Sequence, residues 1–157
     1  MKYKRGEYLA KALEDLEQIQ NNANFGYRPY GPTCSHVQQY VEKMLKEKIV
    51  ELGADPRFEH SLGVLLDEVS KLSGVSFSPD LYLMCSTLEE YYFAGRYPTK
   101  SKIVFSEELT LEAIDYGNRI VAEIEGICVG GTRRTVNKSP KNVRVQKKGR
   151  RFFRRRR

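Results

Sequence analysis

Three side chains of this sequence are of types that could act on a phosphate group: His36, His60 and Arg96. Histidine has a pKa of about 6.5 in peptides, so it can transfer a proton near neutral pH. Arginine keeps its charge and offers paired N–H donors, so it can serve as the cation but not as the base. RNA cleavage without a metal needs both kinds of group. The three residues are therefore candidates for nucleotide binding or, in an enzyme, for catalysis.

Each of these residues also has a structural interpretation, which the sequence leaves open. His60 could hydrogen-bond a neighbouring chain end at the start of a helix, and His36 could bond across a helical bundle. Arg96 could form a salt bridge with Glu90 or Asp80. In the functional alternative, the two histidines and the arginine line one groove, where the arginine binds a nucleotide phosphate.

Aromatic residues flank the arginine in the stretch YYFAGRYP, residues 91–98. Tyr92 or Tyr97 could stack on a base while Arg96 contacts the phosphate, because aromatic rings accept the faces of unpaired bases. Tyr97 therefore joins the predicted nucleotide-binding residues.

Five helices are predicted to position these residues. Apolar residues recur at steps of three and four, which is typical of amphipathic helices. The predicted helices cover 6–22, 34–52, a segment that follows Asp55-Pro56, 78–95 and 106–127. No hairpin signal separates two alternating runs, so we expect an all-α fold, an up-down bundle of four to five helices. The long connection over 21–33 is either functional or a cap on the end of the bundle.

Proline and glycine mark several predicted helix ends. Asp55-Pro56 and Ser78-Pro79 predict helix starts, because a capping side chain precedes a proline. Gly95 and Pro98 predict the end of the fourth helix. The stripes expected to face the core include Leu9, Leu13, Leu16, Leu72 and Leu83. The second helix is expected to have a charged outer face, which consists of Glu42, Lys43, Lys46 and Glu47. Gln39, Glu42 and Lys43 are interpreted as a surface that is solvated or faces a dimer partner.

Charge divides the chain into a body, 1–131, and a basic arm, 132–157. The arm has 13 Lys and Arg and no Asp or Glu, whereas the body has 14 of the 27 basic residues and all 20 acidic ones. The body therefore carries −6 and the arm +13. Such an arm is expected to be disordered and to contact nucleic acid; an anionic membrane surface or no specific target are the alternatives. Its predicted contact residues are Arg150, Arg151, Phe152, Phe153, Arg154, Arg155, Arg156 and Arg157.

The remaining composition points to no metal and no cofactor. Cys34, Cys85 and Cys128 are widely spaced and form no CxxC pair, so they are interpreted as reduced, mostly buried thiols. No apolar run is long enough to span a membrane, and the first residues lack the apolar core of a signal peptide. We expect a cytoplasmic protein of one domain plus the arm.

Four short motifs resemble the HEPN family, whose members are small helical bundles common in bacteria and archaea. The first helix contains ALEDLEQI, the second SHVQQYVEKMLK, the third opens with RFEHSLGVLL, and the fourth closes with YYFAGRYP. The resemblance covers about residues 5 to 127 and leaves the arm without a counterpart. The matching positions are His36, Gln39, Glu42, Lys43, His60, Leu62, Tyr92, Arg96, Tyr97 and Pro98.

The resemblance implies a homodimer that handles nucleotides or RNA. Some members are ribonucleases, some are toxins, and some are inactive partners of small nucleotidyltransferases. The nucleases carry an arginine followed, after four to six residues, by a histidine. Here that window after Arg96 holds Ser101, Lys102 and Ile103, so the nuclease motif is absent.

The resulting expectation is a non-catalytic bundle that binds nucleotide or RNA, with a nucleotidyltransferase as a candidate partner. One alternative is a metal-independent, toxin-like ribonuclease that uses His60, His36 and Arg96 from displaced positions. The other is a module that serves only for dimerisation or interaction.

Overall fold

The computed structural model describes residues 1–98 and 102–128, which fold as five α-helices without a strand. The helices are α1 (Glu7–Ala23), α2 (Tyr30–Glu51), α3 (Leu62–Ser73), α4 (Pro79–Arg96) and α5 (Glu107–Glu125). The predicted all-α bundle is thereby confirmed. Residues 132–157, with all eight predicted contact residues from Arg150 to Arg157, lie outside the described part of the chain.

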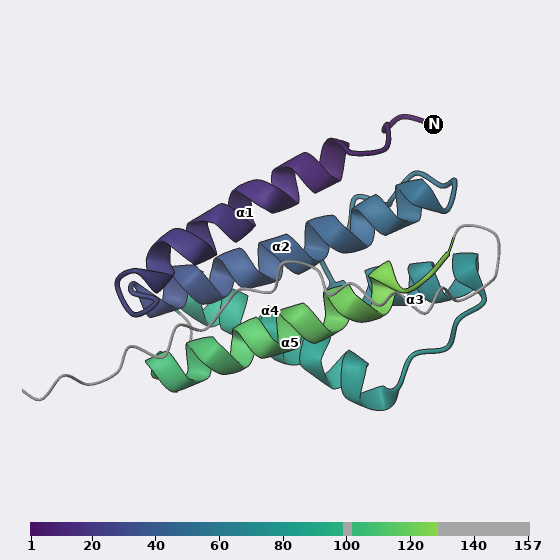
Figure 1. Ribbon diagram of the computed structural model, residues 1–157. Helices are drawn as coiled ribbons and strands as arrows, with labels where there is room; N and C mark the ends of the chain where they lie inside the picture. The colour runs from purple at the N-terminus through teal and green to yellow at the C-terminus, as the bar shows by residue number, and fades with distance from the viewer. Residues whose placement is uncertain (99–101, 129–157) are drawn as a thin grey trace, which may run out of the picture.

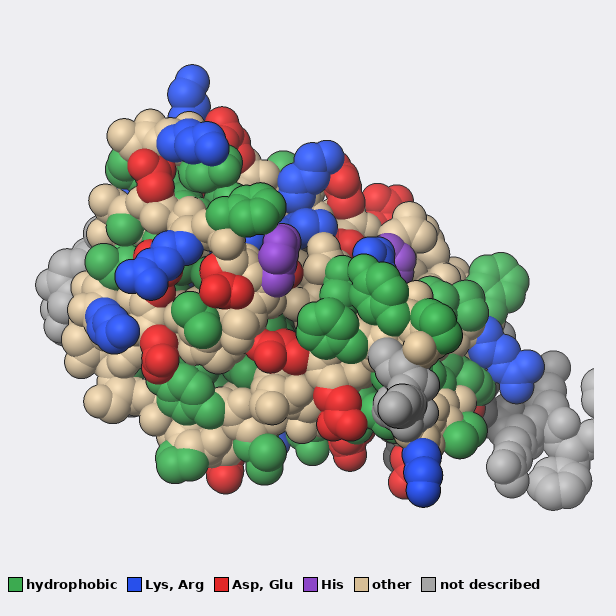
Figure 2. All heavy atoms as spheres, turned by 180° about the vertical axis from the view of Figure 1, so that it is seen from behind, with side chains coloured by type: hydrophobic (Ala, Val, Ile, Leu, Met, Phe, Trp, Pro, Cys, Tyr) green, Lys and Arg blue, Asp and Glu red, His purple; other side chains and the backbone are tan. Residues whose placement is uncertain are grey.

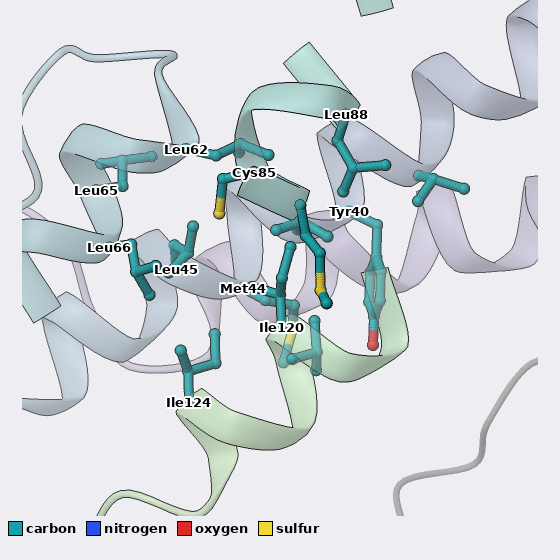
Figure 3. Close-up of a cluster of buried hydrophobic side chains, with 14 of the residues drawn as sticks. Tyr40, Met44, Leu45, Leu62, Leu65, Leu66, Cys85, Leu88, Ile120 and Ile124 are labelled. Carbon is teal, nitrogen blue, oxygen red and sulfur yellow. The ribbon is translucent and has the colours of Figure 1, made fainter. Parts of the chain in front are cut away.

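Helix α2 is the centre of the bundle. Helix α1 packs along one side of it, α4 and α5 pack on the other, and α3 contacts both α2 and α4 (Figure 1). Because neighbours surround it, α2 buries residues around its whole circumference, including Tyr40, Met44 and Leu45. Figure 3 shows these side chains converging with those of α3, α4 and α5. Each such buried side chain contributes about 1.5–3 kcal/mol of hydrophobic stabilisation.

Most of the charged face predicted for α2 is buried. Glu42, Lys46 and Glu47 are each no more than 6% exposed. Their charges are tolerated because they are paired: Lys46 Nζ donates to Glu42 Oε1 at 2.8 Å, and Glu47 accepts from backbone N–H groups at the start of α1. The prediction failed because a charged stripe on a central helix looks the same in sequence as one on a surface helix.

The predicted apolar stripe of α1 is wrong at Leu9 and Leu13, whereas Leu16 packs against the core as expected. Leu9 and Leu13 are 38% and 51% exposed, while Ala12, Asp15 and Ile19 face α2. Leu72 and Leu83, expected in the core, are exposed as well. Asp15 can lie on the inner face of α1, beside Ala12 and Ile19, because α1 packs against polar residues of α2.

Two predicted boundaries near α2 and α3 differ from those observed. Helix α2 begins at Tyr30, so the expected long connection shrinks to residues 24–29. Helix α3 begins at Leu62 with Ser61 as its cap, not at Asp55-Pro56. The Asp55 carboxylate instead accepts hydrogen bonds from the backbone N–H groups of Lys2 and Tyr3, so it anchors the N-terminal segment.

Gly95 lies within α4 and does not end it. The helix continues to Arg96 and is capped by Tyr97, while Ser78 and Pro79 start it as predicted. Gly95 is needed for packing, since a Cβ at this position would lie 2.9 Å from the carbonyl oxygen of Gly31 in α2. The glycine therefore permits the close crossing of α2 and α4.

Two of the cysteines are core thiols, as predicted. Burial raises the pKa of Cys34 to about 11 and that of Cys85 to about 12, so neither is a nucleophile near neutral pH. In the described residues, no helix is long and apolar enough to cross a bilayer.

Candidate functional site

A pocket of about 430 Å³ opens between α2, α4 and the segment that leads into α3. Its lining combines aromatic rings with carboxylates, and it comprises Gln38, Glu42, Glu59, His60, Ser61, Glu89, Tyr92, Phe93 and Tyr97. Figure 2 shows one face of the molecule on which both histidines lie, with a cluster of hydrophobic side chains beside one of them. The pocket is thus a place where ring stacking and hydrogen bonding can act on the same ligand.

One face of α4 supplies part of the pocket lining, and Arg96 lies on the same face. Glu89, Tyr92, Phe93 and Arg96 follow one another at steps of three, one and three residues, so they share a helix face. The rings of Tyr92 and Phe93 lie edge to face at 5.5 Å between centroids, and Phe93 and Tyr97 are 6.3 Å apart. Phe93 and Tyr97 are more than half exposed. Exposed aromatic rings around a hollow are unusual in a surface that contacts only water.

Glu42 of α2 lines the pocket and has several hydrogen-bonding partners. Its Oε1 accepts from Lys46 at 2.8 Å and pairs with His60 Nδ1 at 3.1 Å, and its Oε2 accepts from the Gln38 amide at 3.3 Å. The pairing with the carboxylate orients the imidazole of His60, whose side chain is otherwise exposed. In its neutral form this histidine therefore directs Nε2 away from Glu42.

Two further glutamates hold the backbone at the start of α3. Glu89 Oε1 accepts from the Ser61 hydroxyl at 3.0 Å and from the N–H groups of Leu62 and Gly63. Glu59 accepts from the N–H groups of His60 and Ser61. These backbone hydrogen bonds lower the pKa of Glu59, so it is ionised at neutral pH.

Arg96 lies at the edge of this pocket. Its guanidinium donates to the Tyr92 hydroxyl at 3.3 Å and lies 5.1 Å from the centroid of the same ring. Among the described residues it enters no ion pair, so the salt bridge considered with Glu90 or Asp80 is not formed. The guanidinium is exposed and available to an anion at the rim.

His36 belongs to a different cluster. Its Nδ1 contacts Asp15 Oδ1 of α1 at 2.9 Å, and Lys43 donates to the other carboxylate oxygen. Burial alone would raise the pKa of Asp15, but the hydrogen bonds from His36 and Lys43 outweigh it and hold the pKa below its usual value. The bond across the bundle that the sequence offered for His36 is thus the observed arrangement.

The structure brings His60, Tyr92 and Tyr97 together in the pocket, with Arg96 beside Tyr92. His36 is not part of the pocket lining, so the two histidines and the arginine do not line one groove. Sequence reasoning missed Glu59, Glu89 and Phe93. The three- and four-residue spacing from Glu89 through Tyr92 and Phe93 could have identified two of them.

The site can bind a planar, partly polar ligand. Rings can stack on it, carboxylates can accept its N–H groups, and an arginine can contact an attached anion. In the part of the chain that the structure describes, no group of three His, Cys, Asp or Glu side chains could hold a metal ion.

Comparisons with known proteins agree on one family. The profile of the HEPN domain matches residues 6–127. Among solved structures, TT1696 from Thermus thermophilus is 25% identical, with a TM-score of 0.66 over 78% of this chain and 98% of that chain. An archaeal HEPN homologue, ST0689, is 26% identical, with a TM-score of 0.60 over 79% and 98% of the two chains. A search of curated proteins gave no match.

Proposed function

This chain belongs to the HEPN family, and from that premise we propose that it binds nucleotides or single-stranded RNA without cleaving them. The base enters the pocket beside α4, and the phosphate lies outside it. The basic arm adds affinity for a polyanion without choosing a sequence.

One observation carries the proposal: exposed aromatic rings surround a pocket that also contains hydrogen-bonding groups. Phe93 and Tyr97 are 55% and 54% exposed, and the ring of His60 is open to solvent as well. Stacking of a base on an aromatic ring contributes about 1–3 kcal/mol. The pocket volume of about 430 Å³ suits one base with part of its sugar.

The charges explain why the phosphate is proposed to lie at the rim. Glu42, Glu59 and Glu89 line the pocket, so a phosphate inside it would meet carboxylates. Arg96 lies at the edge, on the ring of Tyr92, where it can donate two parallel hydrogen bonds to phosphate oxygens. In the proposed complex, the base therefore lies in the pocket on one side of Tyr92, and the phosphate lies on the other side, at Arg96.

A ribonuclease is the second candidate, favoured by the contact between His60 and Glu42. A carboxylate that holds one imidazole nitrogen orients the other for proton transfer. Against this candidate, the sequence lacks the family's nuclease motif after Arg96. A homodimer and a nucleotidyltransferase partner, both implied by the family, stay predictions.

The test compares nucleoside monophosphates with a labelled single-stranded RNA, each titrated into the full-length protein at about 0.15 M salt. We expect Arg96→Gln and Tyr97→Ala to weaken monophosphate binding at least fivefold, because one removes the phosphate donor and the other a stacking ring. Arg119→Gln is the matched control, since Arg119 is an exposed helix arginine with one loose contact, 3.9 Å, to Asp115.

Cleavage of the RNA is followed in the same samples by gel electrophoresis. Binding without cleavage supports the proposal. RNA cleavage by the wild-type protein, in a preparation free of metal, that disappears in His60→Ala would contradict the proposal and support the ribonuclease alternative. Monophosphate binding that is unchanged in Arg96→Gln and Tyr97→Ala would remove the pocket from the function.

A further inference from the structure

We propose that the pocket selects bases that carry an exocyclic amine (adenine, cytosine and guanine) over uracil, and that Glu89 is the specificity-determining residue. The inference rests on the proposed function, because it concerns the base that occupies the pocket.

Glu89 is a carboxylate fixed through one oxygen. Its Oε1 accepts from the Ser61 hydroxyl, Leu62 N–H and Gly63 N–H, three donors that converge from the start of α3. Its Oε2 takes part in no hydrogen bond among the described residues, and Glu89 lines the pocket. A side chain held in this way keeps one acceptor in place for a ligand without losing further rotamer freedom on binding.

Two polar side chains near Glu89, Gln38 and Ser61, do not supply a competing donor. Both functions of the Gln38 amide are used, since its nitrogen donates to Glu42 and its oxygen accepts from Gln39. The Ser61 hydroxyl donates to Glu89 itself. Glu59 adds a second ionised acceptor at the same end of the pocket. The wall formed by the start of α3 therefore offers acceptors to a ligand.

The edges of the bases respond differently to such a wall. Adenine and cytosine present an amine that donates hydrogen bonds, and guanine presents one beside a ring N–H. Uracil presents two carbonyl oxygens around a single N–H, and these oxygens would be repelled by the carboxylates. A site that hydrogen-bonds a ligand N–H discriminates strongly against an analogue that lacks it, because the polar group of the protein is then left unpaired.

The ligands can be matched so that only the amine changes. Adenosine 5′-monophosphate is compared with purine riboside 5′-monophosphate, and guanosine 5′-monophosphate with inosine 5′-monophosphate, by calorimetric titration of the full-length protein. The members of a pair have the same phosphate and nearly the same stacking surface. We expect loss of the amine to weaken binding about tenfold, and uridine 5′-monophosphate to bind more weakly than the three amine-bearing monophosphates.

The variant Glu89→Gln tests the residue. Glutamine can keep one oxygen for the three donors of α3 while replacing the free oxygen with an N–H₂ donor. We expect the advantage of each amine-bearing ligand to fall below about threefold and binding of uridine 5′-monophosphate to improve. Glu90→Gln is the control, because Glu90 is the next residue of α4 and is exposed. Circular dichroism checks that each variant remains folded.

The outcomes separate this inference from the function on which it rests. Equal affinities within both matched pairs in the wild-type protein would overturn the inference even if no variant folds. If Arg96→Gln still weakened all monophosphates, the proposed function would stand without base selection. If no monophosphate bound to the wild-type protein, both would fail.

Discussion

Glu42 is a buried charged residue that lines the pocket and holds His60. It is 5% exposed and contacts two groups that can be cationic, Lys46 and His60. A buried ion pair is not by itself strongly stabilising, but removal of one partner leaves the other charge buried and unpaired. The same residue therefore matters for stability and for the orientation of the His60 ring.

The substitution Glu42→Gln should destabilise the protein by about 3 kcal/mol, because it strands the ammonium group of Lys46 in the interior. Urea unfolding followed by circular dichroism measures this difference. Glu14→Gln is the control, since the Lys11–Glu14 pair also lies within one helix but is 63% exposed on both sides. That change should cost less than about 1 kcal/mol. Equal effects of the two substitutions would show that the Glu42 pairing is dispensable.

Asp15 gives the stability a predictable dependence on pH. Its pKa is lower in the folded protein than in the unfolded chain, so its contribution is fully present above the unfolded value of about 3.9 and is lost as the pH falls through the folded value. The difference in unfolding free energy between wild type and Asp15→Asn should therefore be largest at neutral pH and should shrink toward pH values of about 3.

Urea denaturation at several pH values measures this difference for Asp15. At neutral pH we expect about 1–2 kcal/mol, the cost of removing charge-assisted hydrogen bonds to His36 and Lys43. Asp115→Asn is the control, because that carboxylate is 64% exposed. A difference for Asp15 that grows on acidification would contradict the assigned direction of the pKa shift.

At the scale of the elements, the N-termini of two helices donate backbone hydrogen bonds to carboxylates of other helices. Glu47 of α2 accepts from the N–H groups of Gly6 and Leu9 at the start of α1, and Glu89 of α4 does the same for α3. Carboxylates stabilise helix N-termini through the unpaired N–H groups and the helix dipole. These contacts fix where α1 and α3 lie relative to α2 and α4.

This arrangement explains which parts of the fold could be predicted from sequence. The predicted start at Ser78-Pro79 and the predicted start at residue 106 were correct, and the Ser106 side chain accepts from Leu109 N–H at the start of α5. The predicted start of α3 was wrong, because part of the cap of this helix comes from Glu89, which is distant in the sequence. Asp55 resembled a cap but binds the N-terminal segment instead.

The candidate site was also predictable only where local sequence features mark its residues. The YYFAGRYP stretch pointed to Tyr92 and Tyr97, which line the pocket, and to Arg96, which contacts Tyr92, because aromatic and cationic residues are conspicuous at a helix end. Glu89 was missed because its spacing to Tyr92 and Phe93 shows only that the three share a helix face, and not whether that face lines a pocket. Only the packing of α3 against α4 gives it a role.

The crossing of α2 and α4 depends on Gly95, and its substitution tests the packing of the bundle. In Gly95→Ala the new methyl group would lie 2.9 Å from the carbonyl oxygen of Gly31, a backbone atom that cannot move alone. We expect a loss of about 1–3 kcal/mol of unfolding free energy, typical of overpacking. Thermal and urea denaturation measure it.

Gly63→Ala is the matched control for this substitution. Gly63 also lies in a helix, α3, but the nearest atom to an added Cβ is the Ser61 hydroxyl at 3.9 Å. Alanine should be neutral there or stabilising by up to about 1 kcal/mol, because it has the higher helix propensity. If both variants were stabilised alike, the close approach of α2 and α4 would have no energetic importance.

At the scale of the whole molecule, the two parts of the chain should bind different features of RNA. The body carries −6 and presents Arg96 beside its pocket, whereas the arm carries +13. Contacts with phosphates release counterions, so each contact to a single strand contributes about −0.7 to the slope of log K against log salt concentration. The slope measured for the full chain or for the body therefore gives the number of phosphates that it contacts.

We expect the full chain to bind a single-stranded RNA with a slope of several units and residues 1–131 to bind it with a slope of about −0.7, the value expected if Arg96 alone contacts a phosphate. Filter binding from about 0.05 to 0.3 M salt measures both. Replacement of Phe152 and Phe153 by alanine in the full chain should lower the affinity without changing the slope, because stacking releases no counterions. An unchanged slope in 1–131 would place the phosphate contacts on the bundle and leave the arm without the proposed role.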